Sequence, residues 1–463
     1  MKSDGLTRAA LTLVVSGLAF ALAGGGLRLA STSLCSFGHG ACATAAADAA
    51  DPTPSAVPPL PAGSPGVLAP TAPAATPSPV AAPPTAAPAT PPPPRPSTPQ
   101  PSAAPVATHA PAKAPRPHAV PAPLRVTSTG TRMELLKVIS GNLDPKSVVS
   151  SGTGLVFAQN MMYLHTINVY DAGFRMLKII PDSVDLAALG YPQYRGTYRG
   201  APVEAAVSPD HRYVYVSNYS MYGAAPFNRE GHDDCGPGDG YPDSFVYRIN
   251  LSTLSIDQAI AVGSVPKYLA VTPDGRYLLV SNWCSYSLSV VALRGGKRGS
   301  EIRRIPLGPY PRGIAVDPSG SVAYVAVMGS TRIAVLDLRT FALSWIEGVG
   351  RSPRHLVLSP DGRSLFATIN GEGIVDKIDV ATRRVTARVA TGQAPRSMAI
   401  SSDGGSLYVV NYESNTVSKL RASDMSLLQV VKTNEAPIGI TYDRPSRRVW
   451  VACYSGSIMV FGG

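Results

Sequence analysis

The sequence predicts an all-β fold, a seven-bladed β-propeller, for the larger C-terminal part of this 463-residue chain. One hairpin pattern recurs along this part: an apolar run, a turn of the Pro-Asp-Gly type and an alternating strand that ends near an asparagine, as in Tyr268–Asn282. A proline opens each copy, and successive prolines are 57, 64, 45, 42, 42 and 42 residues apart. A period near 42 residues with several short strands per unit is typical of propeller blades. The seven prolines are Pro145, Pro202, Pro266, Pro311, Pro353, Pro395 and Pro437.

Each unit is expected to supply four antiparallel strands in chain order. The first strand follows the proline and lines the central channel, and the second ends near the asparagine. Blade one departs from this pattern, because Ser150–Gly154 replaces the Asp-Gly turn. Third strands are predicted at Ser287–Leu293, Arg332–Leu338 and Thr416–Leu420, and a fourth strand at Arg383–Ala390.

The two ends of the predicted propeller complement each other. Glu134–Ile139 has the pattern of a fourth strand but no blade before it, and the chain ends after a third strand at Ser457–Phe461. We expect these two segments to pair, because the pairing completes the seventh blade and removes an exposed strand edge.

Residues 1–45 are predicted to direct export. Two basic residues precede an apolar run, Ala9–Ala23, as in a secretory signal, and the small residues of Ala43–Ala45 could form a cleavage site. An uncleaved anchor is the alternative, because Ala9–Ala30 is close to the roughly 20 residues that a membrane-spanning helix needs. Either alternative predicts an extracytoplasmic protein, secreted or anchored to the membrane or cell surface, which meets the membrane only through this segment.

Residues 46–125 are rich in Pro, Ala, Thr and Ser and are expected to form a disordered linker. Runs such as Pro91–Pro94 favour an extended polyproline conformation and have no apolar side chains to bury. The linker is expected to be a passive spacer. The propeller domain is therefore predicted to span residues 126–463.

The composition narrows the class of protein. The chain has 41 Lys and Arg against 30 Asp and Glu, a net charge of +11. This excess is compatible with an acidic partner, although it does not favour nucleic acid in particular. Five cysteines are too few for a fold built on disulfides. Cys35 and Cys42 precede the predicted fold, and Cys453, which replaces the repeat asparagine, is expected to be buried.

The repeats resemble those of the YVTN-repeat (YncE-like) seven-bladed propellers and are also similar in appearance to lactonase-type propellers. The resemblance is carried by three second strands, each behind a Pro-Asp or Ser-Asp turn: Tyr213–Asn218, Tyr277–Asn282 and Leu407–Asn411. It implies the fold and leaves the function open, because propellers host both binding and catalysis.

Basic residues recur at the position after the repeat proline. In a closed ring these residues meet at one mouth of the channel, where convergent cations attract anions. The alternative is that this position points to solvent, where lysine and arginine are common. The basic residues are Lys146, Lys267, Arg312, Arg354 and Arg396, while Val203 and Ile438 occupy the position in the two remaining units.

Aromatic residues recur just after the second strand, at Tyr219, Trp283, Tyr412 and Tyr454. Rings beside basic residues suit stacking on sugars or bases. The alternative is that they pack between neighbouring blades.

Two insertions, Ile180–Gly200 and Ser220–Phe245, distinguish blade two. Both are expected on the mouth face, next to each other, as a cap over one side of the channel. Cys235 in the second insertion is predicted to pair with Cys284 of the next blade, because both lie on this face and export permits oxidation.

The second insertion also holds Asp233, Asp234, Asp239 and Asp243, which could bind Ca²⁺ through carboxylate oxygens. Their spacing does not match the twelve-residue calcium loop, so a solvated polar loop is the favoured interpretation and no cofactor is expected. For catalysis the candidates are His355 and Glu204, at equivalent positions on two inner strands. No nucleophile elbow, phosphate-binding loop or zinc motif is present.

The favoured function is a binding or scaffold module of the cell envelope, most simply a monomer, which binds an anionic or glycan polymer or a protein at the channel mouth. The alternatives are an enzyme of lactonase or lyase type that uses His355 and Glu204, and a purely structural surface protein. Nucleic acid is a possible partner but is not favoured.

Overall fold

The computed structural model describes residues 132–463, except residues 229, 230 and 232. The predicted export segment, the predicted linker, and Cys35 and Cys42 lie outside the described residues. In the described part, β-strands predominate, and the one helical segment is a short 3₁₀ turn, η1 (Pro237–Asp239). This part contains no helix with the length and apolar character needed to cross a membrane.

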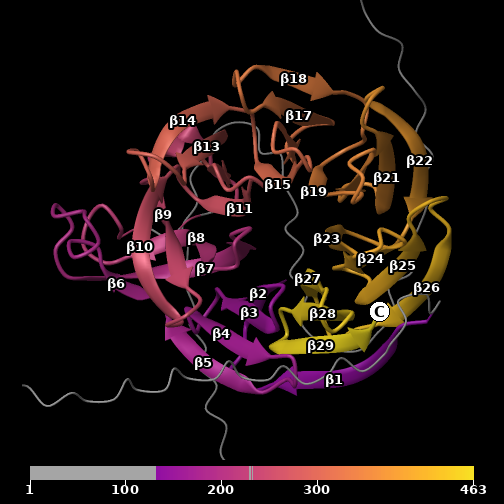
Figure 1. The fold of residues 1–463 in the computed structure, drawn as a ribbon, viewed down its shortest axis with the longest axis horizontal. Helices are drawn as coiled ribbons and strands as arrows, with labels where there is room; N and C mark the ends of the chain where they lie inside the picture. Colours follow the sequence, from indigo (N-terminus) through magenta and orange to yellow (C-terminus); the bar gives the residue numbers. More distant parts are fainter. Residues whose placement is uncertain (1–131, 229–230, 232) are drawn as a thin grey trace, which may run out of the picture. The chain divides into compact units, whose positions relative to one another are not determined.

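Seven antiparallel sheets form the ring of a seven-bladed propeller, as the repeats predict (Figure 1). Each blade has its repeat proline on the inner strand, and the next strands follow outward in chain order. Blade 1 contains β2 (Pro145–Ser150), β3 (Leu155–Asn160), β4 (Thr166–Asp171) and β5 (Met176–Pro181); blade 2 contains β6 (Ser183–Asp185), β7 (Thr197–Val207), β8 (Tyr213–Tyr222), β9 (Ser244–Asn250) and β10 (Ser255–Val262). Blade 3 contains β11 (Pro266–Val271), β12 (Tyr277–Asn282), β13 (Ser287–Ala292) and β14 (Ser300–Pro306); blade 4 contains β15 (Pro311–Val316), β16 (Val322–Val327), β17 (Arg332–Asp337) and β18 (Leu343–Ile346). Blade 5 contains β19 (Pro353–Leu358), β20 (Ser364–Ile369), β21 (Ile374–Asp379) and β22 (Arg384–Ala390); blade 6 contains β23 (Pro395–Ile400), β24 (Ser406–Asn411), β25 (Thr416–Arg421) and β26 (Leu427–Lys432). Blade 7 contains β27 (Pro437–Asp443), β28 (Arg448–Cys453), β29 (Ser457–Gly462) and β1 (Glu134–Ser140).

The turn between the first and second strands follows from its sequence. In blade 3 the N–H of Gly275 donates to the carbonyl of Thr272 at 2.8 Å, and Gly275 has a φ of +65°, a conformation that favours glycine. Blade 1 lacks the Asp-Gly sequence. There the Ser151 hydroxyl accepts the N–H groups of Thr153 and Leu155, each at 3.1 Å, and so holds the turn by a side chain.

Strand β1 closes the ring, as predicted. It pairs antiparallel with β29, and Val138 lies opposite Met459. Met133, just before β1, is buried, and its N–H donates to Gln429 Oε1 at 2.5 Å. The Met133 carbonyl accepts a hydrogen bond from Gln429 Nε2 at 3.2 Å. Because Gln429 belongs to β26, the start of the domain joins blade 7 to blade 6 as well as completing blade 7.

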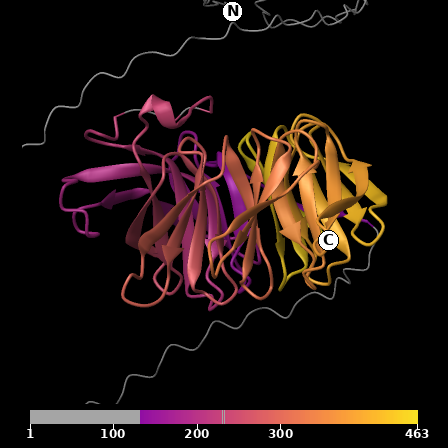
Figure 2. The same ribbon diagram turned by 90° about the horizontal axis from the view of Figure 1, so that it is seen from above.

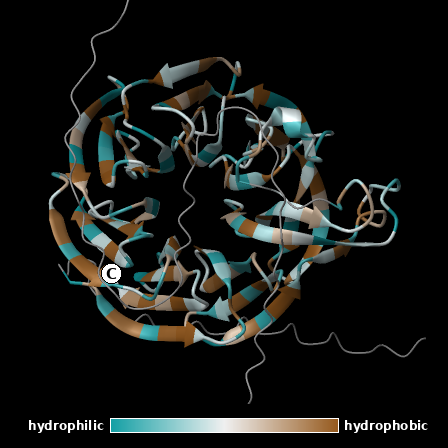
Figure 3. Cartoon of the chain, turned by 180° about the vertical axis from the view of Figure 1, so that it is seen from behind, coloured by the Kyte–Doolittle hydropathy of each residue, from teal (hydrophilic) through white to brown (hydrophobic). Residues whose placement is uncertain are grey.

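The hydrophobic core lies between adjacent blades, where alternate side chains of one sheet face the next sheet. Trp450 and Ile458 of blade 7 pack with Val148 and Val156 of blade 1, and equivalent clusters join the other blades. Apolar residues also occur on the outermost strands (Figure 3). The exposed ones include Leu135, Leu136, Val138, Met176, Leu177, Leu427 and Val430.

The two insertions of blade 2 form one local structure, which confirms that they are neighbours. Val184 and Leu186 of the first insertion pack against Met221 and Phe227 of the second. β7 and β8 are longer than the other inner and second strands, and β6 pairs with the start of β7.

The prediction that both insertions cap the channel mouth is wrong for the first one. Residues 182–196 project from the outer side of the ring, because β6 adds to the extended part of β7 (Figure 1). The second insertion, with η1, rises above one face of the ring (Figure 2).

Candidate functional site

The chain enters the inner strands of blades 3 to 7 through one repeated backbone turn. The residue before each repeat proline has a positive φ, an unfavourable conformation for a residue with a Cβ. Its carbonyl accepts a hydrogen bond from the N–H of the residue that follows the second strand, at 2.9 to 3.1 Å. This bond brings the residue after the repeat proline and the residue after the second strand to the same end of their blade. The residues with positive φ are Val265 (+51°), Tyr310 (+60°), Ser352 (+59°), Ala394 (+51°) and Ala436 (+55°).

The channel mouth contains a cavity of about 600 Å³. The structure brings all nine residues of the predicted ligand-binding set to its lining. They are the cations Lys146, Lys267, Arg312, Arg354 and Arg396, and the aromatic residues Tyr219, Trp283, Tyr412 and Tyr454. Asp233, predicted only as a possible metal ligand, also lines this cavity.

Further lining residues come from blades 1 and 2 and are missed by the sequence analysis. Met161 follows the second strand of blade 1, the position that holds aromatic residues in other blades, so an alignment of all large apolar residues would have found it. Met162 and Tyr163 lie in the turn between β3 and β4, and Tyr222 is the last residue of the extended strand β8. No periodic signal could have indicated these three.

Lys146 and Arg312 share one carboxylate. Lys146 Nζ and Arg312 Nη2 each lie 3.4 Å from Glu204 Oε1, and the three side chains are 6%, 5% and 9% exposed. Burial lowers the pKa of Lys146 well below its usual value. Glu204 opposes this shift, whereas the positive charges of Arg312, Arg354 and Lys267 add to it.

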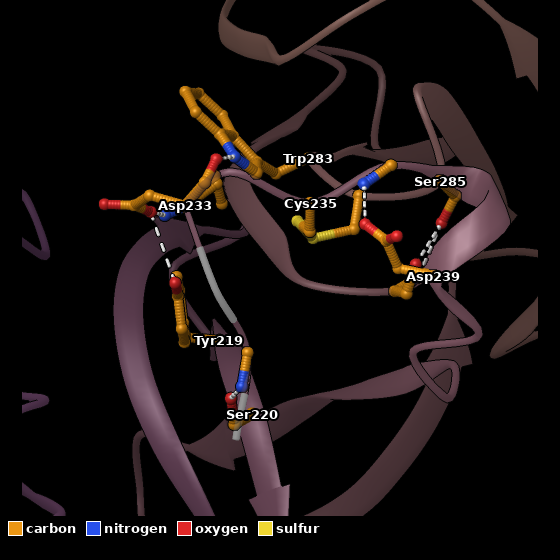
Figure 4. Close-up of a disulfide and its surroundings, with 12 residues drawn as sticks. Tyr219, Ser220, Asp233, Cys235, Asp239, Trp283 and Ser285 are labelled. Atoms are coloured by element: carbon orange, nitrogen blue, oxygen red, sulfur yellow. Dashed lines mark hydrogen bonds and ion pairs between the residues drawn. A yellow bond between two sulfur atoms is a disulfide. The ribbon is translucent and has the colours of Figure 1, made fainter. Parts of the chain in front are cut away.

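Lys267 is held by a carboxylate and two rings. Its Nζ lies 2.8 Å from Asp233 Oδ1, 4.1 Å from the ring centroid of Tyr219 and 4.8 Å from that of Trp283. Tyr219 donates its hydroxyl to Asp233 Oδ1 at 3.2 Å, and Trp283 donates Nε1–H to the Asp233 carbonyl at 2.8 Å (Figure 4). Burial lowers the pKa of Lys267 to about 7, although Asp233 opposes the shift. The charge of Lys267 therefore changes near neutral pH.

Arg354 and Arg396 have no ion pair with any carboxylate of the described residues. Arg354 is buried, donates Nη1–H to the Met328 thioether at 3.7 Å, and has no hydrogen-bond partner at Nε within the described structure. The guanidinium carbon of Arg396 lies 3.7 Å from the ring centroid of Tyr412, and its Nε also lacks a hydrogen-bond partner among the residues that the structure describes. Burial and the neighbouring Arg312 and Arg396 lower the pKa of Arg354, yet a guanidinium stays protonated near neutral pH. Among the described residues, the site thus contains buried guanidinium charge that no ion pair neutralises, which is costly.

The aromatic rings of the site contact the protein's own side chains. Tyr219 and Trp283 contact Lys267, and Tyr412 contacts Arg396. Trp283 also stacks on Tyr310, with ring centroids 4.6 Å apart. We therefore assign these rings to the positioning of cations, which cation–π contacts stabilise.

The four predicted calcium ligands are not brought together as one metal site. In the described part of the chain, no three His, Cys, Asp or Glu side chains form a group that could hold a metal. The carboxylates have separate partners instead: Lys267 for Asp233, the Gly236 N–H for Asp239 and Arg304 for Asp243, while Asp234 is exposed.

His355 and Glu204, the predicted acid–base pair, both lie on inner strands and are both buried. His355 Nε2 is 3.2 Å from the Tyr268 hydroxyl, and its Nδ1 accepts the N–H of Met398 at 3.3 Å. Burial lowers the pKa of His355 to about 3, so the imidazole is neutral near pH 7. Both ring nitrogens thus have protein partners, and a catalytic role for His355 stays a prediction.

In the structure a disulfide joins Cys235 to Cys284, with Cα atoms 5.2 Å apart (Figure 4). It fixes the second insertion to blade 3 beside Trp283 and Asp233. Cys453 is a buried free cysteine, as predicted.

The Cys284→Ser variant is expected to lose about 2–4 kcal/mol of unfolding free energy, because the bond closes a loop across a sequence separation of 49 residues. Denaturant titration with and without a reducing agent measures this loss. Reduction should destabilise the natural protein and leave the variant unchanged. Two free thiols in the oxidised protein, detected by mass mapping, would contradict the bond.

Comparisons with known proteins agree with the propeller fold. Residues 254–340 match the model of the lactonase, 7-bladed beta-propeller family, and residues 317–456 match that of the cytochrome D1 heme domain. Each match covers less than one third of the chain. A solved structure of Kuenenia stuttgartiensis hydrazine synthase is 18% identical, with a TM-score of 0.54, and the alignment covers 70% of this chain and 97% of that one. This likeness shows the fold alone. No curated protein sequence matches the chain.

The match to a haem domain raises the question of whether the cavity suits a haem. Its described lining residues offer the thioethers of Met161 and Met162 but no imidazole or thiolate to bind iron. The nitrogens of His355 are engaged by Tyr268 and Met398. The described lining residues therefore supply no histidine or cysteine ligand for a haem, and we propose no haem chemistry.

Proposed function

We propose that the propeller is a receptor for a compact anionic ligand, such as a di- or tricarboxylate, which binds in the cavity at the channel mouth. The observation that carries the proposal is the buried guanidinium of Arg354, which has no carboxylate partner among the described residues. A bound anion would supply the missing counterion and acceptor, because arginine recognises carboxylates through paired hydrogen bonds.

The charge of the whole site supports an anion rather than a neutral sugar. Five cations line the cavity, and the carboxylates paired with them are Glu204 and Asp233. The aromatic rings contact the cations, so the rings are less suited to stacking on a glycan. The same carboxylate chemistry could come from a free metabolite or from an acidic polymer of the cell envelope. The Cys235–Cys284 disulfide supports our further proposal that the protein works outside the cytoplasm.

Calorimetric titration of the full chain with citrate tests the proposal. A second titration uses polygalacturonate, which presents carboxylates on a polymer. Citrate should bind, and its affinity should fall as salt rises and as pH rises through about 7, where Lys267 loses its proton. Binding of polygalacturonate alone would identify a polymer as the source of the anion. Binding of neither, at low salt and pH 6, would overturn the proposal.

A matched pair of charge reversals distinguishes the contribution of the cavity's own charges to citrate binding from that of the protein's net charge. Arg396→Glu at the mouth and Lys297→Glu between β13 and β14, on the opposite face, change the total charge equally. We expect Arg396→Glu to weaken citrate binding about 100-fold or more and Lys297→Glu to change it less than about twofold. Equal losses in the two variants would mean that net charge alone attracts the anion.

A further inference from the structure

Lys146 differs from the other cations of the cavity in what surrounds its amine. Its ammonium shares Glu204 with Arg312 at 3.4 Å, whereas Lys267 has its own carboxylate at 2.8 Å and two rings within 5 Å. The positive charges of Arg312, Arg354 and Lys267 act on Lys146, and its side chain is 6% exposed. Burial and like charges both favour a neutral amine.

A neutral lysine amine beside cations is an activated nucleophile. Lys146 lines the same cavity as Arg354, the guanidinium that has no carboxylate partner among the described residues. An amine and an arginine in one cavity match a ligand that carries a carbonyl group next to a carboxylate. Glu204, at 3.4 Å from the amine, is placed to move protons.

We propose that Lys146 forms an imine with the carbonyl carbon of a 2-oxo acid whose carboxylate binds at Arg354. This inference rests on the proposed function, since it uses the same anion-binding cavity. It adds a substrate class, the 2-oxo acids, and a covalent step to that function.

The step balances with the groups in the site. The nitrogen lone pair of Lys146 forms the C–N bond, and the carbonyl π pair moves to oxygen. Glu204 accepts the two amine protons in turn and returns each to this oxygen, which leaves as water when the C=N bond forms. The products are one imine and one water, and no oxidant or reductant is needed.

Reductive trapping tests the inference on the full chain. Incubation with pyruvate and sodium cyanoborohydride near pH 7, followed by peptide mass mapping, should place the adduct on Lys146. The exposed Lys297 serves as an internal control that should react only at higher pH, because it lies outside the cavity. Lactate has the same carboxylate but no carbonyl and should give no adduct.

Two further measurements connect the label to the cavity. Citrate should slow labelling of Lys146, because it competes for Arg354. Arg354→Met should slow labelling by pyruvate about tenfold or more and leave labelling by acetaldehyde, which has no carboxylate, unreduced. Lys146→Met should remove the label; if that variant does not fold, protection by citrate in the natural protein still tests the site.

The outcomes separate this inference from the function on which it rests. Citrate binding without a pyruvate adduct on Lys146 would overturn the imine and leave the anion receptor intact. An adduct that forms on Lys267 or on exposed lysines in preference to Lys146 would also overturn it. Failure of labelling together with failure of both citrate and polygalacturonate to bind would overturn the proposed function itself.

Discussion

Deletion of residues 133–140 is expected to lower the melting temperature by at least about 10 °C and to cause aggregation. The deletion removes the whole partner strand of β29, whose ladder with β1 runs from Glu134 opposite Gly462 to Ser140 opposite Ser457. It also removes Met133, which is buried between blades 6 and 7 and makes two hydrogen bonds to Gln429. The newly exposed edge of β29 can pair with other molecules. Thermal unfolding and light scattering measure the two effects.

A single substitution within β1 provides the control. Leu136 lies at the bulge of the ladder, has no partner residue on β29 and is 45% exposed. Leu136→Ser should therefore change the unfolding free energy by less than about 0.5 kcal/mol. A deletion variant as stable as this control would show that β1 does not close the ring in solution.

Arg354→Met is expected to raise stability and to abolish anion binding in the same protein. Removing a buried charge that has no carboxylate partner in the described part of the chain relieves repulsion by Arg312 and Arg396 and should stabilise the fold by about 1–3 kcal/mol. The same change removes the guanidinium proposed to bind the ligand and should weaken citrate binding about 100-fold or more. Denaturant titration and calorimetry measure the two quantities.

A gain in stability together with a loss of citrate affinity distinguishes a ligand-binding arginine from a structural one. A structural arginine loses stability when it is truncated, because its partners are left unpaired. Arg363→Met, in the turn between β19 and β20 of the same blade, is the matched control, since Arg363 is exposed. It should leave both quantities nearly unchanged. A less stable Arg354→Met protein that still binds citrate would contradict the assignment.

The sequence was sufficient to predict the ring because each blade is a local repeat. The prolines mark the inner strands, and the antiparallel order of strands then puts Lys146 and Arg354 at one mouth without any knowledge of side-chain contacts. Strand β1 could be assigned for the same reason, since Glu134–Ile139 was one strand too many at the start and the last blade was one strand short.

Contacts between blades could not be predicted in this way. Glu204 contacts Lys146 and Arg312 across sequence separations of 58 and 108 residues, and the contact depends on side-chain conformations that no repeat pattern encodes. Asp233 looked like a calcium ligand among neighbouring carboxylates, whereas its partner is Lys267 of the next blade. The direction of the first insertion depends on the extra length of β7, which the hydrophobic pattern does not reveal.

The position of Met133 has a mechanical consequence. Any load applied through the chain on its N-terminal side reaches the propeller at this residue, before it reaches the ladder between β1 and β29. The load is divided there between the paired hydrogen bonds to Gln429 of β26 and the buried contacts of the Met133 side chain. Tension is thus spread over two adjacent blades and does not act on one strand alone. The inner strands, which line the cavity, lie at the opposite edge of those sheets from the point of loading.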